Sequence, residues 1–400
     1  MTEESADFLL SPPGRDLLAQ ADALRADRAD TLIALTRLRK TATPEQALAA
    51  WEMADLRRRG AAKFGPDATH MLFVREALEQ ASGLGTATYH ARRFVEAGAT
   101  TISDLGGGIG GDALAFARAG LTVTLFERDP VRARFAEENA QALGLSERLA
   151  VVQADVTVSD LAPGAAWLDP ARRQDRRRVW DPEDFSPPLS WLDELRVRGM
   201  DSIGVKLSPA LDHALASRYG AELEFISEGG ECREALLWLG GVQSGERLRA
   251  VILTPGGVHV ISGEADDPGR PAVAAQGDWL YEPDPAVIRA HLVRTLGARL
   301  NAAPVDPQIA YLLGDTLTPT PFATAYEVLE RFPYGRKRLQ EALAARGVGR
   351  VIIKKRGFPQ EPDELCRQLT LRGTNEMIVI LARLGSGHEA FLCRLAPEKV

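Results

Sequence analysis

The residues best suited to hold a small ligand lie in one glycine-rich segment, Asp-Leu-Gly-Gly-Gly-Ile-Gly-Gly-Asp at 104–112. An apolar run precedes this segment and an apolar helical run follows it. Because glycine has no Cβ atom, its backbone turns tightly and approaches a ligand closely, and a helix start offers unpaired N–H groups. The segment predicts a ligand-cradling loop, with a plain strand-to-helix turn as the alternative.

Two classes of ligand compete for this loop. Gly106, Gly108 and Gly111 match the dinucleotide fingerprint, which is a weak pattern when it stands alone. Asp104, however, stands two residues before the first glycine. A carboxylate there would repel a pyrophosphate and attract an ammonium or a sulfonium. S-adenosylmethionine carries both positive groups, so we expect this cofactor and keep a nicotinamide oxidoreductase as the alternative.

Two further acids follow the next predicted strands. Glu127 ends the run 121–126, 17 residues after Gly110, and an acid at this place accepts hydrogen bonds from ribose hydroxyls. Asp155 follows the third run and is predicted to accept a hydrogen bond from the adenine amino group. A helix cap or a surface acid is the alternative interpretation of Asp155.

The fourth strand leads into the residues predicted to face the acceptor. Asp169 and Pro170 follow the run Ala165–Leu168. In an open α/β sheet, ligands bind beyond the carboxyl ends of the strands, near the point where the strand order reverses. Methyl transfer from a sulfonium is an in-line displacement in which the protein mainly orients the nucleophile. We therefore predict Asp169 and Pro170 as the catalytic residues, against a strand-ending turn.

Basic residues surround the same predicted edge. Arg172 and Arg173 open an arginine-rich stretch that either grips phosphates or forms a solvated loop paired with nearby acids. Lys206 ends the fifth strand and is predicted to bind substrate, with a lysine that merely extends to solvent as the alternative. The three cysteines form no CxxC pair and the six histidines show no ligand spacing, so we expect no metal.

A second basic region lies near the C-terminus. Residues 321–400 contain 14 Lys+Arg and 9 Asp+Glu, whereas the whole chain has a net charge of −7. Lys354, Lys355 and Arg356 form one cluster and 336–338 another. Positive charge gives sequence-independent affinity for phosphates, and Phe358 could stack a base. We predict Lys354, Lys355 and Arg356 as substrate-binding, against a solvated strand end.

The elements that must position these residues follow from hydrophobic periodicity. Residues 1–98 are predicted to be helical, with a capping box at 43–46, a helix start near Asp67, and a third helix that ends at Gly98. From Thr100 short β-branched runs alternate with helical stretches, which is typical of a parallel sheet. The predicted strands are 100–105, 122–126, 149–152, 165–168, 202–207, and a closing hairpin of 222–226 with 234–239.

The rest of the chain is predicted to be α+β. A hairpin of 248–253 with 258–261 precedes one helix, Pro285 to Leu300, and an extended run near 309–313. From about 318 the pattern is strand, helix, strand, helix, strand, strand. The predicted domains are a helical domain (1–98), a cofactor-binding core (99–245), a hairpin with a small domain (246–317) and an α+β domain (318–400).

Composition excludes several classes of protein. The chain has 400 residues, of which 45% are hydrophobic and 26% charged, so disordered and disulfide-scaffold classes are excluded. The acidic N-terminus predicts no signal peptide, and no apolar run is long enough for a membrane span. We expect a cytoplasmic protein that does not enter membranes.

Taken together, these motifs resemble bacterial class I S-adenosylmethionine-dependent methyltransferases with a C-terminal THUMP-like domain. The resemblance rests on 104–112, on Asp-Pro-Ala-Arg-Arg at 169–173, on Val-Lys-Leu-Ser-Pro at 205–209 and on Gly-Glu-Cys-Arg-Glu at 230–234. Ile-Lys-Lys-Arg-Gly at 353–357 and Leu-Thr-Leu-Arg-Gly at 369–373 resemble the THUMP-like domain, and 281–313 resembles a small ferredoxin-like domain.

The resemblance implies a Rossmann-like, seven-stranded methyltransferase core with RNA, either tRNA or rRNA, as substrate. It also implies that Asp104, Gly106, Gly108 and Gly110 hold the methionine end of the cofactor. The tetrad Asp-Pro-Ala-Arg that starts at Asp169 lacks the aromatic residue that usually stacks a target base. A non-catalytic RNA-binding protein with a relict methyltransferase fold therefore stays open as an alternative.

Overall fold

The computed structural model describes residues 1–171, 173–174, 177–178, 181–265, 273–274 and 276–397. The chain forms two compact units. The first contains Met1–Leu207, Leu211–Ala221 and Leu236–Ser244. The second contains Ser208–Ala210, Glu222–Ala235 and Gly245–Val400. The four predicted domains stay a prediction.

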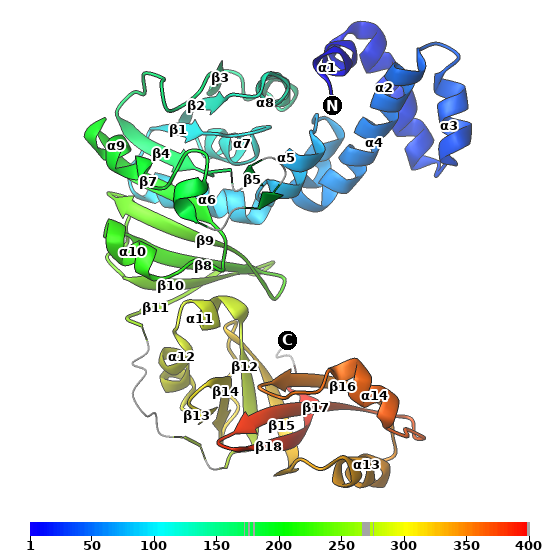
Figure 1. The fold of residues 1–400 in the computed structure, drawn as a ribbon, viewed down its shortest axis with the longest axis vertical. Coiled ribbons are helices and arrows are strands. Elements are labelled where there is room, and N and C mark those ends of the chain that lie inside the picture. The colour runs from blue at the N-terminus through cyan, green and yellow to red at the C-terminus, as the bar shows by residue number, and fades with distance from the viewer. Residues whose placement is uncertain (172, 175–176, 179–180, 266–272, 275, 398–400) are drawn as a thin grey trace. The chain divides into compact units, whose positions relative to one another are not determined.

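The first unit begins with helices (Figure 1). They are α1 (Glu3–Leu10), α2 (Pro12–Ala26), α3 (Thr31–Leu38), α4 (Pro44–Phe64), the 3-10 helix η1 (Gly65–Thr69), α5 (Arg75–Gln80) and α6 (Leu84–Glu96). The predicted capping box is present, since Thr43 and Gln46 exchange side chain-to-backbone hydrogen bonds. The helix predicted to start near Asp67 is interrupted, because the 3-10 helix η1 ends at Thr69 and α5 begins only at Arg75. The side-chain amide of Asn139 pairs with both backbone groups of Leu72, which keeps the chain out of a helix between η1 and α5.

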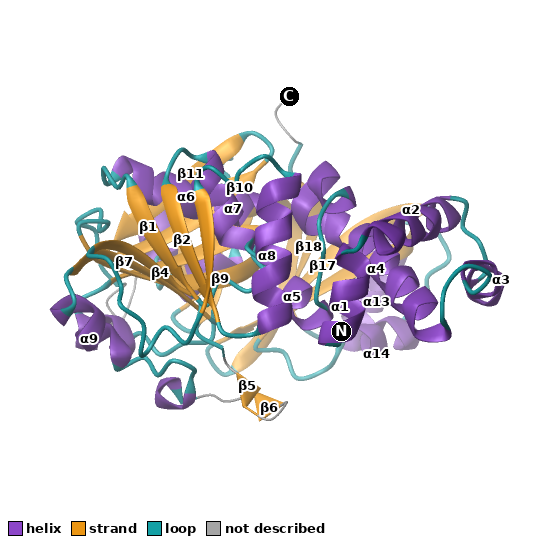
Figure 2. Ribbon diagram, turned by 90° about the horizontal axis from the view of Figure 1, so that it is seen from above, coloured by secondary structure: helices purple, strands orange, loops and turns teal. Residues whose placement is uncertain are grey.

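A parallel sheet fills the rest of the first unit. Its order is β3 (Leu149–Gln153), β2 (Thr122–Glu127), β1 (Thr101–Leu105), β4 (Gly164–Leu168) and β7 (Met200–Leu207), with the second half of β9 (Glu231–Gly240) next to β7. Figure 2 shows β1, β2, β4 and β7 side by side. The strand order reverses between β1 and β4, which is where such sheets bind ligands.

Helices and short elements connect these strands. They are α7 (Gly111–Arg118), α8 (Pro130–Ala142), the two-residue strands β5 (Arg173–Gln174) and β6 (Arg177–Arg178), η2 (Pro182–Asp184), α9 (Trp191–Val197) and α10 (Ala214–Tyr219). The register places Leu105 opposite both Phe126 and Leu168, and Leu168 opposite Val205. The carboxyl ends of four strands therefore lie at one edge, and the residues that follow them are neighbours.

Two hairpins open the second unit. Strand β8 (Glu222–Glu228) turns through Gly229 and Gly230, both with positive φ, into the first half of β9. Strand β10 (Leu248–Thr254) is parallel to β8 and antiparallel to β11 (Gly257–Gly263). All seven strands predicted for the core are therefore present.

A seven-stranded sheet forms the remainder of the second unit. Its order is β13 (Ala303–Asp306), β14 (Ile309–Gly314), β12 (Trp279–Pro283), β15 (Ala323–Pro333), β18 (Gly387–Leu395), β17 (Asn375–Leu384) and β16 (Val348–Arg356). Strands β12 and β13 were not predicted. The single helix predicted from Pro285 to Leu300 is wrong, because the chain breaks at His291, where φ is 55°, into α11 (Pro285–Arg289) and α12 (Val293–Leu300).

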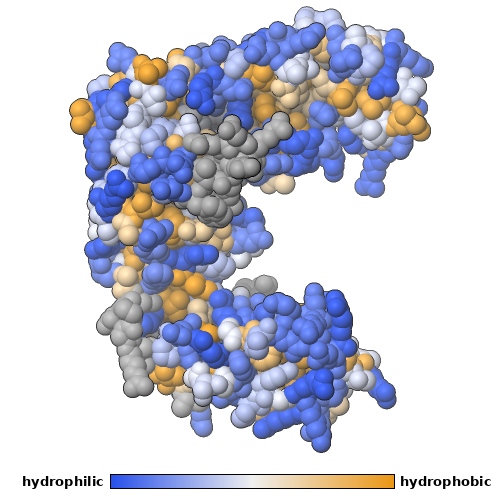
Figure 3. Space-filling view, viewed as in Figure 1, coloured by the Kyte–Doolittle hydropathy of each residue, from blue (hydrophilic) through white to orange (hydrophobic). Residues whose placement is uncertain are grey.

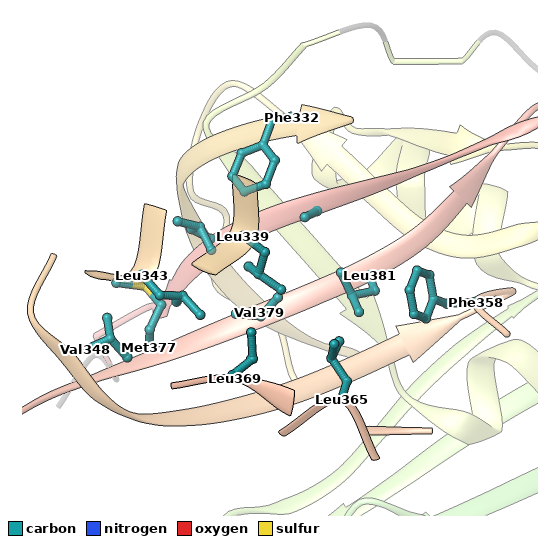
Figure 4. Packing of buried hydrophobic residues seen from close by; sticks show 12 residues of the cluster. Phe332, Leu339, Leu343, Val348, Phe358, Leu365, Leu369, Met377, Val379 and Leu381 are labelled. Atoms are coloured by element: carbon teal, nitrogen blue, oxygen red, sulfur yellow. The ribbon is translucent and has the colours of Figure 1, made fainter. Parts of the chain in front are cut away.

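Two helices complete the C-terminal α+β pattern as predicted. Helices α13 (Arg336–Ala345) and α14 (Pro362–Gln368) contribute Leu339, Leu343 and Leu365 to a core with residues of β16, β17 and β18. Figure 4 shows these side chains gathered against the strands. The sheet therefore has one face covered by helices, as its hydrophobic pattern requires.

Candidate functional site

Asp104 lies near the end of β1 and is the least satisfied charged group of the site. Its side chain is 1% exposed, and neither carboxylate oxygen has a hydrogen-bond partner among the described residues. Burial raises the pKa of Asp104 well above its ordinary value, Asp112 and Asp169 raise it further, and Lys206 opposes them. Burying a carboxylate without a partner costs free energy. Such a group marks a place where a ligand is expected to supply the missing contacts.

The loop after Asp104 has a backbone that only glycine adopts easily. Gly106, Gly108 and Gly110 have φ angles of 91°, 58° and 92°. A Cβ atom on Gly107 would lie 2.7 Å from Asp104 Oδ2 and 2.6 Å from a Leu125 side-chain carbon, so no side chain fits there. A Cβ atom on Gly108 would meet nothing within 4 Å. The loop therefore presents bare backbone to open space.

Glu127 ends β2 and holds this loop in place. Its Oε2 accepts a hydrogen bond from the Gly108 N–H at 3.0 Å, and its Oε1 accepts one from the Asp129 N–H at 2.8 Å. The side chain is buried. Glu127 thus connects the second strand to the glycine loop, and its predicted ribose contact stays a prediction.

Asp155 lies beyond β3 and forms a turn. Its Oδ1 accepts hydrogen bonds from the N–H and the Oγ1 of Thr157, at 3.0 and 2.7 Å. These bonds lower the pKa of Asp155. Arg128 lies 3.7 Å from Oδ2. The predicted adenine contact stays a prediction, and the turn is present in either case.

Asp169 and Lys206 meet at the same edge. Asp169 Oδ2 lies 2.6 Å from Lys206 Nζ. The two residues follow Leu168 and Val205, which are register partners, so their side chains extend from neighbouring strands. The backbone oxygen of Asp169 lies 3.9 Å from the position of a Cβ atom on Gly106, and Pro170 is buried. The predicted acceptor motif therefore lies against the predicted cofactor loop.

Three residues of the site were missed by sequence reasoning. Ser82 Oγ donates to Asp112 Oδ2 at 3.0 Å, and His90 Nδ1 lies 2.8 Å from Asp112 Oδ1. All three side chains are buried. Burial raises the pKa of Asp112, but the hydrogen bonds of His90 and Ser82 and the charges of His90 and Lys206 together lower it by more, so the net pKa is lowered. The only sequence signal is the aspartate in the first turn after the glycines.

Asn139 of α8 also supports the loop. Its buried amide donates to the backbone oxygen of Ile109 at 3.1 Å while pairing with Leu72. The glycine loop is therefore held at Gly108 by Glu127 and at Ile109 by Asn139. A loop fixed in this way can present its backbone to a ligand without first becoming ordered.

The predicted substrate-binding residues have varied placements. Arg172 lies outside the described residues, and so does the side chain of Arg173. In the second unit, Lys354 and Arg356 both approach Glu282, with Nζ–Oε2 and NH2–Oε1 distances of 2.6 and 3.7 Å. Lys355 pairs with Glu361 at 2.6 Å. Their predicted role in binding substrate stays a prediction.

The charges at the carboxyl edge suit a cationic cofactor. Asp112, Asp169 and Glu127 all make Asp104 harder to ionise, and Lys206 is the cation that opposes them. A ligand that carries an ammonium and a sulfonium would relieve this repulsion, whereas a pyrophosphate would add to it. The unpartnered Asp104 oxygens and the open backbone at Gly108 thus fit S-adenosylmethionine.

The fold is that of class I methyltransferases. A crystal structure of a candidate methyltransferase from Porphyromonas gingivalis superimposes with a TM-score of 0.77 over 96% of this chain and 99% of that one, at 22% identity. The family model described as THUMP domain-like matches residues 323–395. A domain of unknown function matches residues 3–60.

Two curated relatives show the family. Both are named as uncharacterised S-adenosylmethionine-dependent methyltransferases of Mycobacterium tuberculosis, and each is 38% identical over 352 residues, covering 85% of this chain and 94% of the relative. The chain belongs to this family of S-adenosylmethionine-dependent methyltransferases. The predicted fold, activity and cofactor are confirmed, and the nicotinamide alternative is wrong.

The described residues contain neither a helix suited to span a membrane nor a group of side chains suited to hold a metal. No helix among the described residues has the length and apolar character needed to cross a bilayer. The described residues also contain no group of three or more side chains suited to hold a metal ion. The cytoplasmic location and the expected lack of a metal stay predictions.

Proposed function

We propose that this methyltransferase acts on RNA, either tRNA or rRNA, and that its C-terminal module contacts the nucleic acid. The observation that carries the proposal is a THUMP-like module with excess positive charge on the same chain as a methyltransferase core. Residues 321–400 have 14 Lys+Arg against 9 Asp+Glu in an otherwise acidic chain. Such local charge favours phosphate contacts.

Helix α13 gives this proposal a physical basis. Its first three residues are Arg336, Lys337 and Arg338, and the first turn contains no acid. Cations at a helix N-terminus oppose the helix dipole, so this arrangement costs stability that a bound anion would offset. The Lys337 side chain is 91% exposed. In Figure 3 the visible surface of the region around α13 is largely hydrophilic, as a phosphate-binding face requires.

The site residues would divide the work of methyl transfer. S-adenosylmethionine, when bound, supplies an electrophilic methyl group on its sulfonium. We assign the methionine end to Asp104 with Gly106, Gly108 and Gly110, the ribose to Glu127, and the adenine to Asp155. Asp169 and Pro170 would orient the acceptor atom next to the glycine loop. This orientation, rather than covalent catalysis, would supply most of the rate enhancement.

The test is methyl transfer to RNA from cells that lack the protein. Purified protein with tritium-labelled S-adenosylmethionine is expected to label one RNA size class, and mass spectrometry of its nucleosides identifies the product. Asp169→Ala is expected to lower turnover at least about 100-fold while calorimetry shows unchanged cofactor affinity. Cofactor binding without label in any RNA fraction would overturn the RNA proposal and favour another methyl acceptor.

A further inference from the structure

The ammonium of Lys206 is surrounded by three acceptors from three segments. Its Nζ lies 2.6 Å from Asp169 Oδ2, 3.1 Å from Ser82 Oγ and 3.2 Å from the backbone oxygen of Gln80. The Lys206 side chain is only 7% exposed. A lysine ammonium has three N–H donors, and these acceptors turn it toward the protein.

A buried hydrogen-bond chain supports this ammonium from behind. Ser82 donates to Asp112, and Asp112 is bonded to His90. The His90 ring in turn stacks on Trp167, with ring centroids 4.4 Å apart. Trp167 belongs to β4 and precedes Asp169 by two residues. The helical N-terminal segment thus reaches the acceptor motif through a continuous set of buried side chains.

We propose that Lys206 is a positioning residue, which holds the Asp169 carboxylate ionised and in one orientation for the methyl acceptor. The inference rests on the role of Asp169 in the proposed function. In the reaction the S–CH₃ bond breaks with its electron pair left on sulfur, the acceptor atom bonds to the methyl group, and the acceptor proton passes to water. A carboxylate paired with an ammonium is a weak base, so Asp169 orients the acceptor through a hydrogen bond.

The charges around Asp169 make this role testable by pH. Lys206 of β7 faces Asp169. Three acids lie in the same electrostatic environment, namely Asp104 of β1, Asp112 of α7 and Glu127 of β2. The charges of Asp112, Asp169, Lys206 and Glu127 all affect the pKa of Asp104. His90 is bonded to Asp112. Removing the Lys206 charge would take away an ammonium that lies 2.6 Å from the Asp169 carboxylate. Asp169 would then hold its proton to a higher pH, because the nearby positive charge that favours its ionised form is gone.

The experiment compares Lys206→Met with Lys206→Arg in the full chain. We expect Lys206→Met to lower kcat on the RNA described above about 100-fold at neutral pH, to change KM for S-adenosylmethionine less than about threefold, and to shift the acidic limb of the kcat profile upward. Lys206→Arg keeps the charge and is expected to restore the wild-type profile. Ser82→Ala should give a smaller shift in the same direction.

Lys63 provides a matched control. Its ammonium binds the backbone oxygens of Leu78, Glu79 and Ala81 at the same end of α5, at 2.9, 2.8 and 2.6 Å. We expect Lys63→Met to lower the melting temperature without moving the pH profile. If Lys206→Met is folded and its profile matches the wild type, the positioning role is overturned. If it does not fold, Ser82→Ala and Lys206→Arg decide the question by the same readout.

A second measurement separates this inference from the proposed function. Carbon-13 NMR of the labelled Asp169 carboxyl, assigned by the loss of its signal in Asp169→Asn, reports its titration without any RNA. We expect the wild-type signal to titrate at lower pH than the Lys206→Met signal. If wild type fails to methylate RNA but this difference is present, only the RNA proposal fails. Equal titrations in an enzyme that methylates RNA would overturn the role of Lys206.

Discussion

Charged side chains gather at two places in this chain, at the carboxyl edge of β1 and β4 and along β16. On β16 each basic residue has an acidic partner, because Lys354 and Arg356 approach Glu282 and Lys355 approaches Glu361. At the end of β1 the Asp104 carboxylate is fully buried and both its oxygens lack a partner among the described residues. The cluster on β16 has satisfied its charges within the protein, whereas the carboxylate at the end of β1 has not.

This difference distinguishes charged groups that form ion pairs within the protein from a charged group that is available to a ligand. An ion pair between partly exposed groups contributes little to stability and can be exchanged for a phosphate. A buried carboxylate without a partner lowers stability and persists where a function requires it. The site at β1 therefore suits a cation, whereas the RNA contact that we propose for β16 would require an internal ion pair to open first.

The largest expected effect breaks the cofactor site itself. Gly108→Asp places a side chain and a negative charge in the open space next to Asp104 and Glu127, and forces an aspartate to a φ of 58°. We expect the affinity for S-adenosylmethionine to fall at least about 100-fold by calorimetry, which corresponds to roughly 3 kcal/mol. Gly120→Asp is the control, because Gly120 has a φ of 95° and open surroundings but lies at the end of α7. Unchanged cofactor affinity in Gly108→Asp would contradict the assignment of the loop.

A smaller change tests whether Asp104 is kept for the ligand. Asp104→Asn removes the buried charge, so we expect the free energy of unfolding to rise by about 1–3 kcal/mol. We also expect S-adenosylmethionine to bind more weakly. Since burial raises the pKa of Asp104, the folded wild type binds this proton more tightly than the unfolded chain. The contribution of Asp104 to the free energy of unfolding of the wild type is therefore lost as the pH rises from about 3.9 toward the raised pKa.

The measurement is the melting temperature of both proteins as a function of pH. The advantage of Asp104→Asn is expected to grow across that interval. Glu127→Gln is the matched control, because Glu127 accepts two backbone hydrogen bonds and its amide would leave one donor facing another. It should lower both stability and cofactor affinity. A destabilised Asp104→Asn would remove the contrast between the two acids.

The smallest expected effect concerns the ion pairs on β16. Glu282→Gln removes the partner of Lys354 and Arg356, so we expect the affinity for bulk tRNA at low salt to rise several-fold. The slope of log affinity against log salt should become steeper by about 1. Filter binding across a salt series measures both quantities. Glu361→Gln frees only Lys355 and should have a smaller effect. If Glu282→Gln binds tRNA with the same affinity as the wild type, the cluster on β16 has only a structural role.

The sequence by itself determined the class of the fold and the glycine loop to which we assign the cofactor. Hydrophobic periods of two and 3.6 residues are local properties, so the strands of the core and most helices follow from the chain. The glycines and Asp104 are also local, because positive φ angles and a strand-to-helix turn depend on neighbouring residues. The exceptions are the segment before α5 and the break at His291, where distant partners or a single backbone angle override the pattern.

Only the tertiary structure decided how these residues act together. Ser82, His90 and Asp112 lie on separate elements, and Lys206 contacts Asp169 because β4 and β7 pair in one particular register. The same holds for β16, where Glu282 pairs with two cations, of which Lys354 lies 72 residues away from it in the sequence. Side-chain pairing over such separations depends on which strands become neighbours, and a local pattern contains no information about that.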